Sequence, residues 1–199
     1  MKLQTQQTLS GFLSIAGCLS LMLLLSACSL FGGSTATPTP TSPPAQTLTT
    51  YQGDGYSISY PQSWSAKGSG NLVTFSDPLG ATTFIIEEFP DPNGAISSSA
   101  AIDQGVNSLQ KQGKNFKKVA IAPTTTVNGE KWNQSALTSD ATQNGQATNV
   151  KFVVLSNNHP ASALNTKTYL LTRSAPTQLF DLVDTQSFQP MLQSFKFTA

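Results

Sequence analysis

The sequence has few charged side chains. Charged residues make up 11% of the 199 residues, and the formal net charge is +1 at pH 7. A typical soluble domain carries about 25% charged residues. Sequence-independent binding to nucleic acid needs many Lys and Arg contacts to phosphates. The low charged fraction and the near-zero net charge therefore argue against a nucleic-acid partner. Uncharged polar side chains supply solubility instead, which suits a protein outside the cell.

Cysteine and histidine are also scarce. Both cysteines, Cys18 and Cys28, precede residue 29, and His159 is the only histidine. The chain after Cys28 therefore holds no disulfide, thiolate metal site or thiol nucleophile. Catalytic and metal sites normally need a cluster of such side chains. We expect His159, in the loop-like stretch SNNHPAS, to be an ordinary loop residue; the alternative is an exposed acid/base or a single metal ligand.

Sequence motifs of common enzymes are missing as well. No P-loop, G-x-S-x-G elbow or HExxH motif occurs. In GDGYSI the third glycine of a dinucleotide fingerprint is replaced by Ile58, and a strand rather than a helix is expected to follow. We therefore expect no enzymatic activity, no cofactor and no metal site.

Apolar runs long enough to span a membrane are absent too. The run at 11–27 is interrupted by Gly17, Ser20 and Ser26, and it falls short of the roughly 20 apolar residues of a spanning helix. It follows Lys2 and ends in small residues, as a secretory signal peptide does. Residues 1–27 are therefore expected to be a cleaved signal.

A four-residue motif ends this run. Leu25, Ser26, Ala27 and Cys28 resemble the bacterial lipobox, in which the cysteine thiol is alkylated by a diacylglyceryl group and the preceding peptide bond is cut. The resemblance implies that Cys28 becomes the lipidated first residue, anchored at the extracytoplasmic face of the cell membrane. The stretch ending at Cys18 also fits, but it would leave leucines at the mature N-terminus. The other alternative is a plain signal peptide cleaved after Ala27.

Two regions follow the cysteine. Residues 28–49 are rich in Pro, Thr and Ser and have no charged side chain, so we expect a semi-rigid, extended tether. Residues 50–199 are expected to form one folded domain, with its first ordered residues near Leu48. About 150 residues are enough to bury roughly two thirds of the unfolded surface.

The domain alternates between two periodicities. Period-2 patterns predict strands in YSISY, NLVTFSD, TTFIIEEF, FKKVAIAPTTTV, KWNQSALTS, ATNVKFVVLS and TKTYLLTRS. Helical spacing at 97–112 and again after Pro176 predicts helices, the first capped by Ser97–Ser99 and Gly113. Asn128-Gly129 predicts a two-residue hairpin. This order indicates an α+β fold, with helices covering a mostly antiparallel sheet.

Two aromatic segments suggest a family. GYSISYPQSW at 55–64 and FQPMLQSFKF at 188–197 resemble the PsbP-like lipoproteins, a group named for an extrinsic subunit of photosystem II. The resemblance covers roughly residues 50–198. It implies an α/β/α sandwich around an antiparallel sheet, usually without enzymatic activity, that assists a larger assembly. Neither segment contains a metal-binding or catalytic signature.

Charged clusters provide two weaker candidates. Glu87, Glu88 and Asp91 suggest hard-cation binding through oxygen, but adjacent strand residues point to opposite faces, so a soluble strand end and turn is the preferred interpretation. The segment KQGKNFKK contains four lysines. Their positive charges are favourable at the C-terminal end of a helix and keep a sheet edge exposed to solvent. Contact with anionic lipid headgroups is the alternative for these lysines.

Aromatic side chains are the remaining candidates for a binding surface. Trp64 and Trp132, with Tyr51 and Tyr56, either line an interface or pack in the core. We expect a non-enzymatic accessory lipoprotein that contacts another envelope protein. The alternatives are a small-solute or cation-binding lipoprotein and, last, an extracytoplasmic hydrolase.

Overall fold

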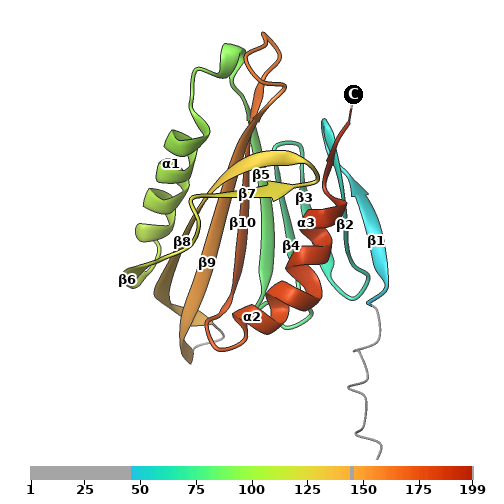
Figure 1. Cartoon of the computed structure of the whole chain (residues 1–199). Helices are drawn as coiled ribbons and strands as arrows, with labels where there is room; N and C mark the ends of the chain where they lie inside the picture. Colours follow the sequence, from blue (N-terminus) through green and yellow to red (C-terminus); the bar gives the residue numbers. More distant parts are fainter. Residues whose placement is uncertain (1–45, 144–145, 199) are drawn as a thin grey trace, which may run out of the picture. The chain divides into compact units, whose positions relative to one another are not determined.

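An eight-stranded sheet is the largest element of the fold (Figure 1). The structure, a computed structural model, describes residues 46–143 and 146–198. The sheet order is β3-β4-β5-β10-β9-β8-β6, and β7 pairs with β8 beside this path. Its strands are β3 (Ser65–Ser69), β4 (Leu72–Ser76), β5 (Thr83–Pro90), β6 (Lys114–Val119), β7 (Thr124–Val127), β8 (Glu130–Gln143), β9 (Gln146–His159) and β10 (Lys167–Pro176). Every described pair is antiparallel, which confirms the expected mostly antiparallel sheet.

A separate three-stranded sheet joins the two ends of the described chain. Its order is β1-β2-β11, and its strands are β1 (Leu48–Gln52), β2 (Tyr56–Pro61) and β11 (Lys196–Phe197). The C-terminal residues therefore pair with a strand formed near the start of the domain, with Phe197 opposite Tyr56.

One long helix packs on one face of the large sheet. A short 3-10 turn, η1 (Pro92–Gly94), precedes α1 (Ser98–Gln110), and α1 contacts β8, β9 and β10. Ser97 caps α1, because its hydroxyl accepts a hydrogen bond from the Ala100 N–H at 3.2 Å. The predicted helix is confirmed. Gly113 does not adopt the expected left-handed cap; a Cβ there would lie 2.1 Å from the Ser139 hydroxyl.

A second helical segment covers the opposite face (Figure 1). It consists of α2 (Phe180–Val183), a π-helical turn η2 (Asp184–Phe188) and α3 (Gln189–Ser194), which follow one another without a break. α2 contacts β10, and α3 contacts β2. The sequence predicts two apolar helical faces here, and the structure joins them through the π-turn.

The hydrophobic core is divided by the sheet. The larger cluster lies with the C-terminal helices and the small sheet, and its biggest fully buried side chains include Trp132, Tyr56, Phe75, Phe84, Phe188 and Phe195. The smaller cluster lies under α1 and contains Ala101, Ile102, Val154 and Leu170. Both helical layers are thus held to the sheet by apolar burial.

The hairpin between β7 and β8 turns at the predicted position. Asn128 and Gly129 have φ of 46° and 86°, the left-handed values that a two-residue turn of this kind needs. Val127 pairs with Glu130 across the turn. This geometry fixes the register of β7, and β7 forms one wall of the site described next.

Candidate binding site

A cavity of about 340 Å³ opens between β7, the face of the large sheet and the C-terminal helices. β7 provides Thr125, Thr126 and Val127, and the turn after it provides Asn128. The helical segment contributes Phe180, Asp181, Asp184, Gln189, Leu192 and Gln193. A volume of this size is in the range of ordinary ligand pockets.

Two cations form part of the cavity floor. Lys151 in β9 lies opposite Ala175, and Arg173 in β10 lies opposite Val153. Because alternate residues of a strand share a face, Lys151 and Arg173 point to the same side of the sheet at diagonal positions. Both line the cavity.

Each cation pairs with an aspartate from the helical segment. Lys151 Nζ lies 3.3 Å from Asp181 Oδ1 and 4.3 Å from the centre of the Phe180 ring. Arg173 donates through Nη1 to Asp184 Oδ1, and Gln189 donates to the other oxygen of Asp184 at 2.9 Å. The two ion pairs therefore connect the helical segment to the sheet and leave the floor electrically balanced.

Arg173 is the more deeply buried of the two cations. Its side chain is 6% exposed, and its Nε–H is buried without a described hydrogen-bond partner. Burial lowers the pKa of Arg173, and the Asp184 carboxylate opposes that effect. A buried donor that lacks an acceptor costs about 1–3 kcal/mol. Arg173, which lines the cavity, thus has a donor without a described acceptor.

Asp184 is also the first residue of an uncommon element. In the π-turn η2 the Gln189 N–H donates to the Asp184 carbonyl, five residues back. Such turns are rare and often lie at functional sites. Here the turn directs the Asp184 carboxylate toward Arg173. Gln189, at the end of the turn, donates to the same carboxylate. The sequence predictions did not include Arg173, although it is the only arginine of the chain and lies within an apolar strand.

A second polar cluster lies where the small sheet meets β5 and β10. Lys167 Nζ contacts three oxygens: Asp54 Oδ2 at 2.7 Å, the Asp54 carbonyl at 3.1 Å and Glu88 Oε1 at 3.3 Å. Burial raises the pKa of Glu88, and Lys167 only partly offsets it. Burial alone would lower the pKa of Lys167, but its bonds to Asp54 and the charge of Glu88 raise it overall. The lysine ammonium therefore occupies the position where these oxygens converge.

The three predicted cation-binding acids do not share a site. Glu87 is exposed and Glu88 is buried on the opposite face of β5, as the strand periodicity predicts. Asp91 is 2% exposed; it accepts bonds from the Ile96 N–H, Asn158 and Thr168 and so organises the loop before α1. In residues 46–143 and 146–198, no group of three or more His, Asp or Glu side chains is placed to hold a metal ion.

His159 is not an ordinary loop residue. It is the last residue of β9, and its ring stacks on Phe197 with centroids 3.7 Å apart and planes at 5°. Its Nδ1 lies 3.8 Å from Glu130 Oε1. The ring therefore packs against the C-terminal strand.

Both tryptophans lie in the core. Trp64 is 9% exposed and contacts Phe188, and Trp132 is 0% exposed and contacts both Phe195 and Phe197. Of the two interpretations, this burial corresponds to core packing rather than to an interface. The strand period explains Trp132, because it faces inward from β8 onto the larger cluster.

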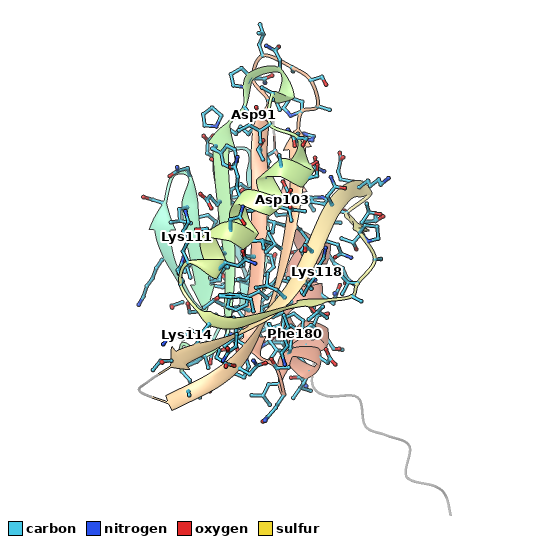
Figure 2. The ribbon with its side chains drawn as sticks, turned by 90° about the vertical axis from the view of Figure 1, so that its left-hand side faces the viewer. Asp91, Asp103, Lys111, Lys114, Lys118 and Phe180 are labelled. Atoms are coloured by element: carbon cyan, nitrogen blue, oxygen red, sulfur yellow. The ribbon has the colours of Figure 1, made fainter. Side chains whose placement is uncertain are left out.

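The lysine-rich stretch covers the end of α1 and the edge strand β6. Lys111, Lys114, Lys117 and Lys118 are all exposed. Figure 2 shows Lys111 at the foot of α1, with Lys114 and Lys118 on the segment that follows. Charges on an unpaired edge discourage pairing with other chains.

The predicted signal peptide, lipobox and most of the tether lie outside the described residues. These include Leu25, Ser26, Ala27 and the proposed lipidation site Cys28. Within the described part of the chain, we find no helix with the length and apolar character needed to cross a bilayer.

Comparisons with solved structures find matches at low identity. A protein of Bacteroides thetaiotaomicron is 11% identical with a TM-score of 0.49, over 75% of this chain and 48% of that one, so this chain spans about half of its length. LpqN of Mycobacterium tuberculosis, involved in cell envelope biogenesis, is 13% identical with a TM-score of 0.47, over 79% and 87%. The Ran-binding protein Mog1p of Saccharomyces cerevisiae is 9% identical with a TM-score of 0.49, over 77% and 96%.

The sequence itself identifies a family. No curated protein matches the chain. The PsbP family, however, matches residues 46–197, from just before β1 to the end of β11. This match confirms the resemblance noted in the two aromatic segments. Because it covers nearly all of the described residues, the chain belongs to the PsbP family.

Proposed function

We propose that the protein is an extracytoplasmic lipoprotein, anchored to the cell membrane through Cys28, whose PsbP domain is a non-enzymatic accessory module that binds another envelope protein. The lipobox and the uncharged tether support the anchor and the spacing from the membrane. The family match over 46–197 supports the nature of the domain.

The observation that carries the binding role is the cavity beside β7. Its charged side chains form two ion pairs that connect the helical segment to the sheet. Its remaining lining consists of amides, hydroxyls and apolar side chains, which are suited to contact rather than to proton transfer. A non-enzymatic binding site is therefore the function that this geometry supports best.

In finer terms, we describe the fold as an α/β/α sandwich. Its outer layers are α1 and the C-terminal helical segment, with the small three-stranded sheet beside the latter. Contacts of α1 with β8–β10 and of α2 with β10 support this description.

The test is crosslinked affinity purification of the full-length protein from its native membranes. The control is a tethered protein that lacks residues 50–199. We expect at least one envelope protein to be enriched only with the intact domain. Equal recovery with both proteins, or no enrichment at good recovery, would contradict the accessory role.

A small-solute or cation-binding lipoprotein is the second candidate. The cavity volume and the buried Arg173 favour a solute over a cation, because Lys167 already occupies the convergence of Asp54 and Glu88 oxygens. A saturable rise in Tm of the domain with a small molecule, in the absence of any protein partner, would favour this candidate.

A further inference from the structure

The outer edge of β7 forms one wall of the cavity. The Pro123 carbonyl accepts a hydrogen bond from the Gln134 N–H of β8, so the Pro123 main chain faces β8. In an antiparallel pair, successive residues alternate between facing the partner strand and facing away. Thr125 and Val127 therefore face β8, and Thr124 and Thr126 turn their main-chain groups outward.

Gln134 covers part of this outer edge. Its side-chain amide donates to the Ala122 carbonyl at 2.9 Å and to the Thr124 carbonyl at 3.4 Å. For Thr126, the contacts described within 46–143 and 146–198 include no partner for the outward N–H and carbonyl. The outward N–H of Thr124 also has no described partner, but of the two outward-facing residues of β7 it is Thr126 that lines the cavity.

Two residues that line the cavity, Arg173 and Thr126, carry hydrogen-bonding groups without a described partner. Arg173 uses Nη1 on Asp184, while its Nε–H is unpaired. Of the five N–H donors of the Arg173 guanidinium, the described contacts pair Nη1 with Asp184. Lys151 and Arg173 are already balanced by Asp181 and Asp184. The occupant that fits these conditions supplies acceptor oxygens without adding net charge.

We propose that the cavity receives an extended segment of the partner protein, which adds to the free edge of β7 through Thr126 and places an uncharged amide or carbonyl oxygen near Arg173. The proposal rests on the protein-binding function above and names the surface and the chemistry of the partner. Exposed strand edges are templates for such addition, and a neighbouring pocket gives it side-chain specificity.

Site-specific photocrosslinking in the full-length protein in native membranes tests the proposal. Benzoylphenylalanine replaces Gln193, an exposed residue of α3 that lines the cavity. The control position is Asp103, exposed on α1 on the opposite face of the sheet (Figure 2). We expect a crosslink to one envelope protein from position 193 and not from 103, with the crosslinked peptide mapping to an extended segment of that protein.

Two variants test whether the main-chain N–H of Thr126 takes part in strand addition. Thr126→Pro removes the outward N–H of an edge strand without removing a bond to β8, and proline is tolerated at such positions. Thr126→Val keeps the N–H and the shape of the side chain. We expect at least a tenfold loss of the crosslink with Thr126→Pro, unchanged yield with Thr126→Val, and a similar Tm for both.

A double variant tests the contribution of Arg173 on the cavity floor. Arg173→Gln alone would leave the half-buried Asp184 carboxylate without its cation, so it is combined with Asp184→Asn, which keeps the site neutral. We expect the folded state to be retained by circular dichroism and the crosslink from position 193 to fall by at least tenfold.

The outcomes separate the proposal from the function on which it depends. Enrichment of a partner with the intact domain, but crosslinks only from position 103, would keep the accessory role and overturn the β7 site. Full crosslinking with Thr126→Pro would also overturn strand addition. No crosslink from position 193 at verified incorporation overturns the site, and failure of the affinity purification overturns the accessory role itself.

Discussion

Lys167 and Glu88 form an ion pair between β10 and β5, with Nζ 3.3 Å from Oε1, while the second oxygen of Glu88 is buried without a described partner. Both oxygens of the Glu88 carboxyl group are thus removed from water, but only one of them has a described partner. Burial raises the pKa of Glu88 for this reason. Tyr56 and Tyr169 lie in the same surroundings, and burial raises the pKa of both.

The raised pKa of Glu88 predicts a pH-dependent stability. The folded protein binds this proton more tightly than the unfolded chain does, so the free energy of unfolding falls as pH rises from about 4.3, the ordinary glutamate pKa, through the raised value. Glu88→Gln cannot titrate and removes this contribution. We therefore compare the difference in Tm between Glu88→Gln and wild type at two pH values, and we expect this difference to be more positive at pH 7 than at pH 4. Each kcal/mol of change in the free energy of unfolding should shift Tm by about 2–4 °C.

Glu87→Gln is the matched control for this measurement. Glu87 precedes Glu88 in β5, but its side chain is exposed on the other face. The pH-dependent change in Tm relative to wild type should be larger for Glu88→Gln than for Glu87→Gln, because only the Glu88 side chain is buried. If the two variants behave alike, Glu88 does not titrate as described.

Local sequence signals predicted those elements that neighbouring residues determine. Ser97 caps α1, and Asn128-Gly129 turns between β7 and β8, because capping and left-handed turns depend on a few adjacent residues. β1, β3 and β11 were not predicted as strands, since LTTYQ, SAKGS and KF have no apolar alternation. β3 forms through pairing with β4, and β1 and β11 form through pairing with β2.

The candidate site depends on contacts that no local pattern encodes. The cavity combines β7, β9, β10 and the C-terminal helices, and its ion pairs join Lys151 to Asp181 and Arg173 to Asp184. Helical periodicity predicted the apolar face of the segment after Pro176. It did not predict the π-turn that orients Asp184, because such a turn differs from an α-helix by a single hydrogen-bond register.

Burial of Trp132 predicts a large loss of stability on truncation. The side chain is 0% exposed and contacts the rings of Phe195 and Phe197. Trp132→Ala should lower the free energy of unfolding by about 3–5 kcal/mol, measured by urea denaturation. Leu164→Ala is the control, since Leu164 is 81% exposed and its loss should change stability by less than about 0.5 kcal/mol. A near-neutral Trp132→Ala would contradict the core position.

The cap of α1 predicts a smaller effect. Ser97→Ala removes the hydroxyl that accepts from the Ala100 N–H, so we expect a loss of about 1 kcal/mol in the free energy of unfolding. Ser97→Asp retains an acceptor and adds negative charge at the positive end of the helix, and it should preserve wild-type stability. Equal losses in both variants would show that the hydroxyl has another role.

The lipid anchor is tested through the thiol on which it depends. If Cys28 carries the diacylglyceryl group, Cys28→Ala leaves no sulfur to form the thioether at that position, and the protein should lose labelling by radioactive palmitate and stay in its precursor form. Cys18→Ala is the matched control, because Cys18 lies within the apolar run and should be removed with the signal peptide. Its labelling should equal that of wild type. Labelling that persists in Cys28→Ala but disappears in Cys18→Ala would move the anchor to Cys18. Labelling that persists in both variants would overturn Cys28 as the lipidation site. An unlabelled wild type would leave cleavage after Ala27 as the explanation of the N-terminus.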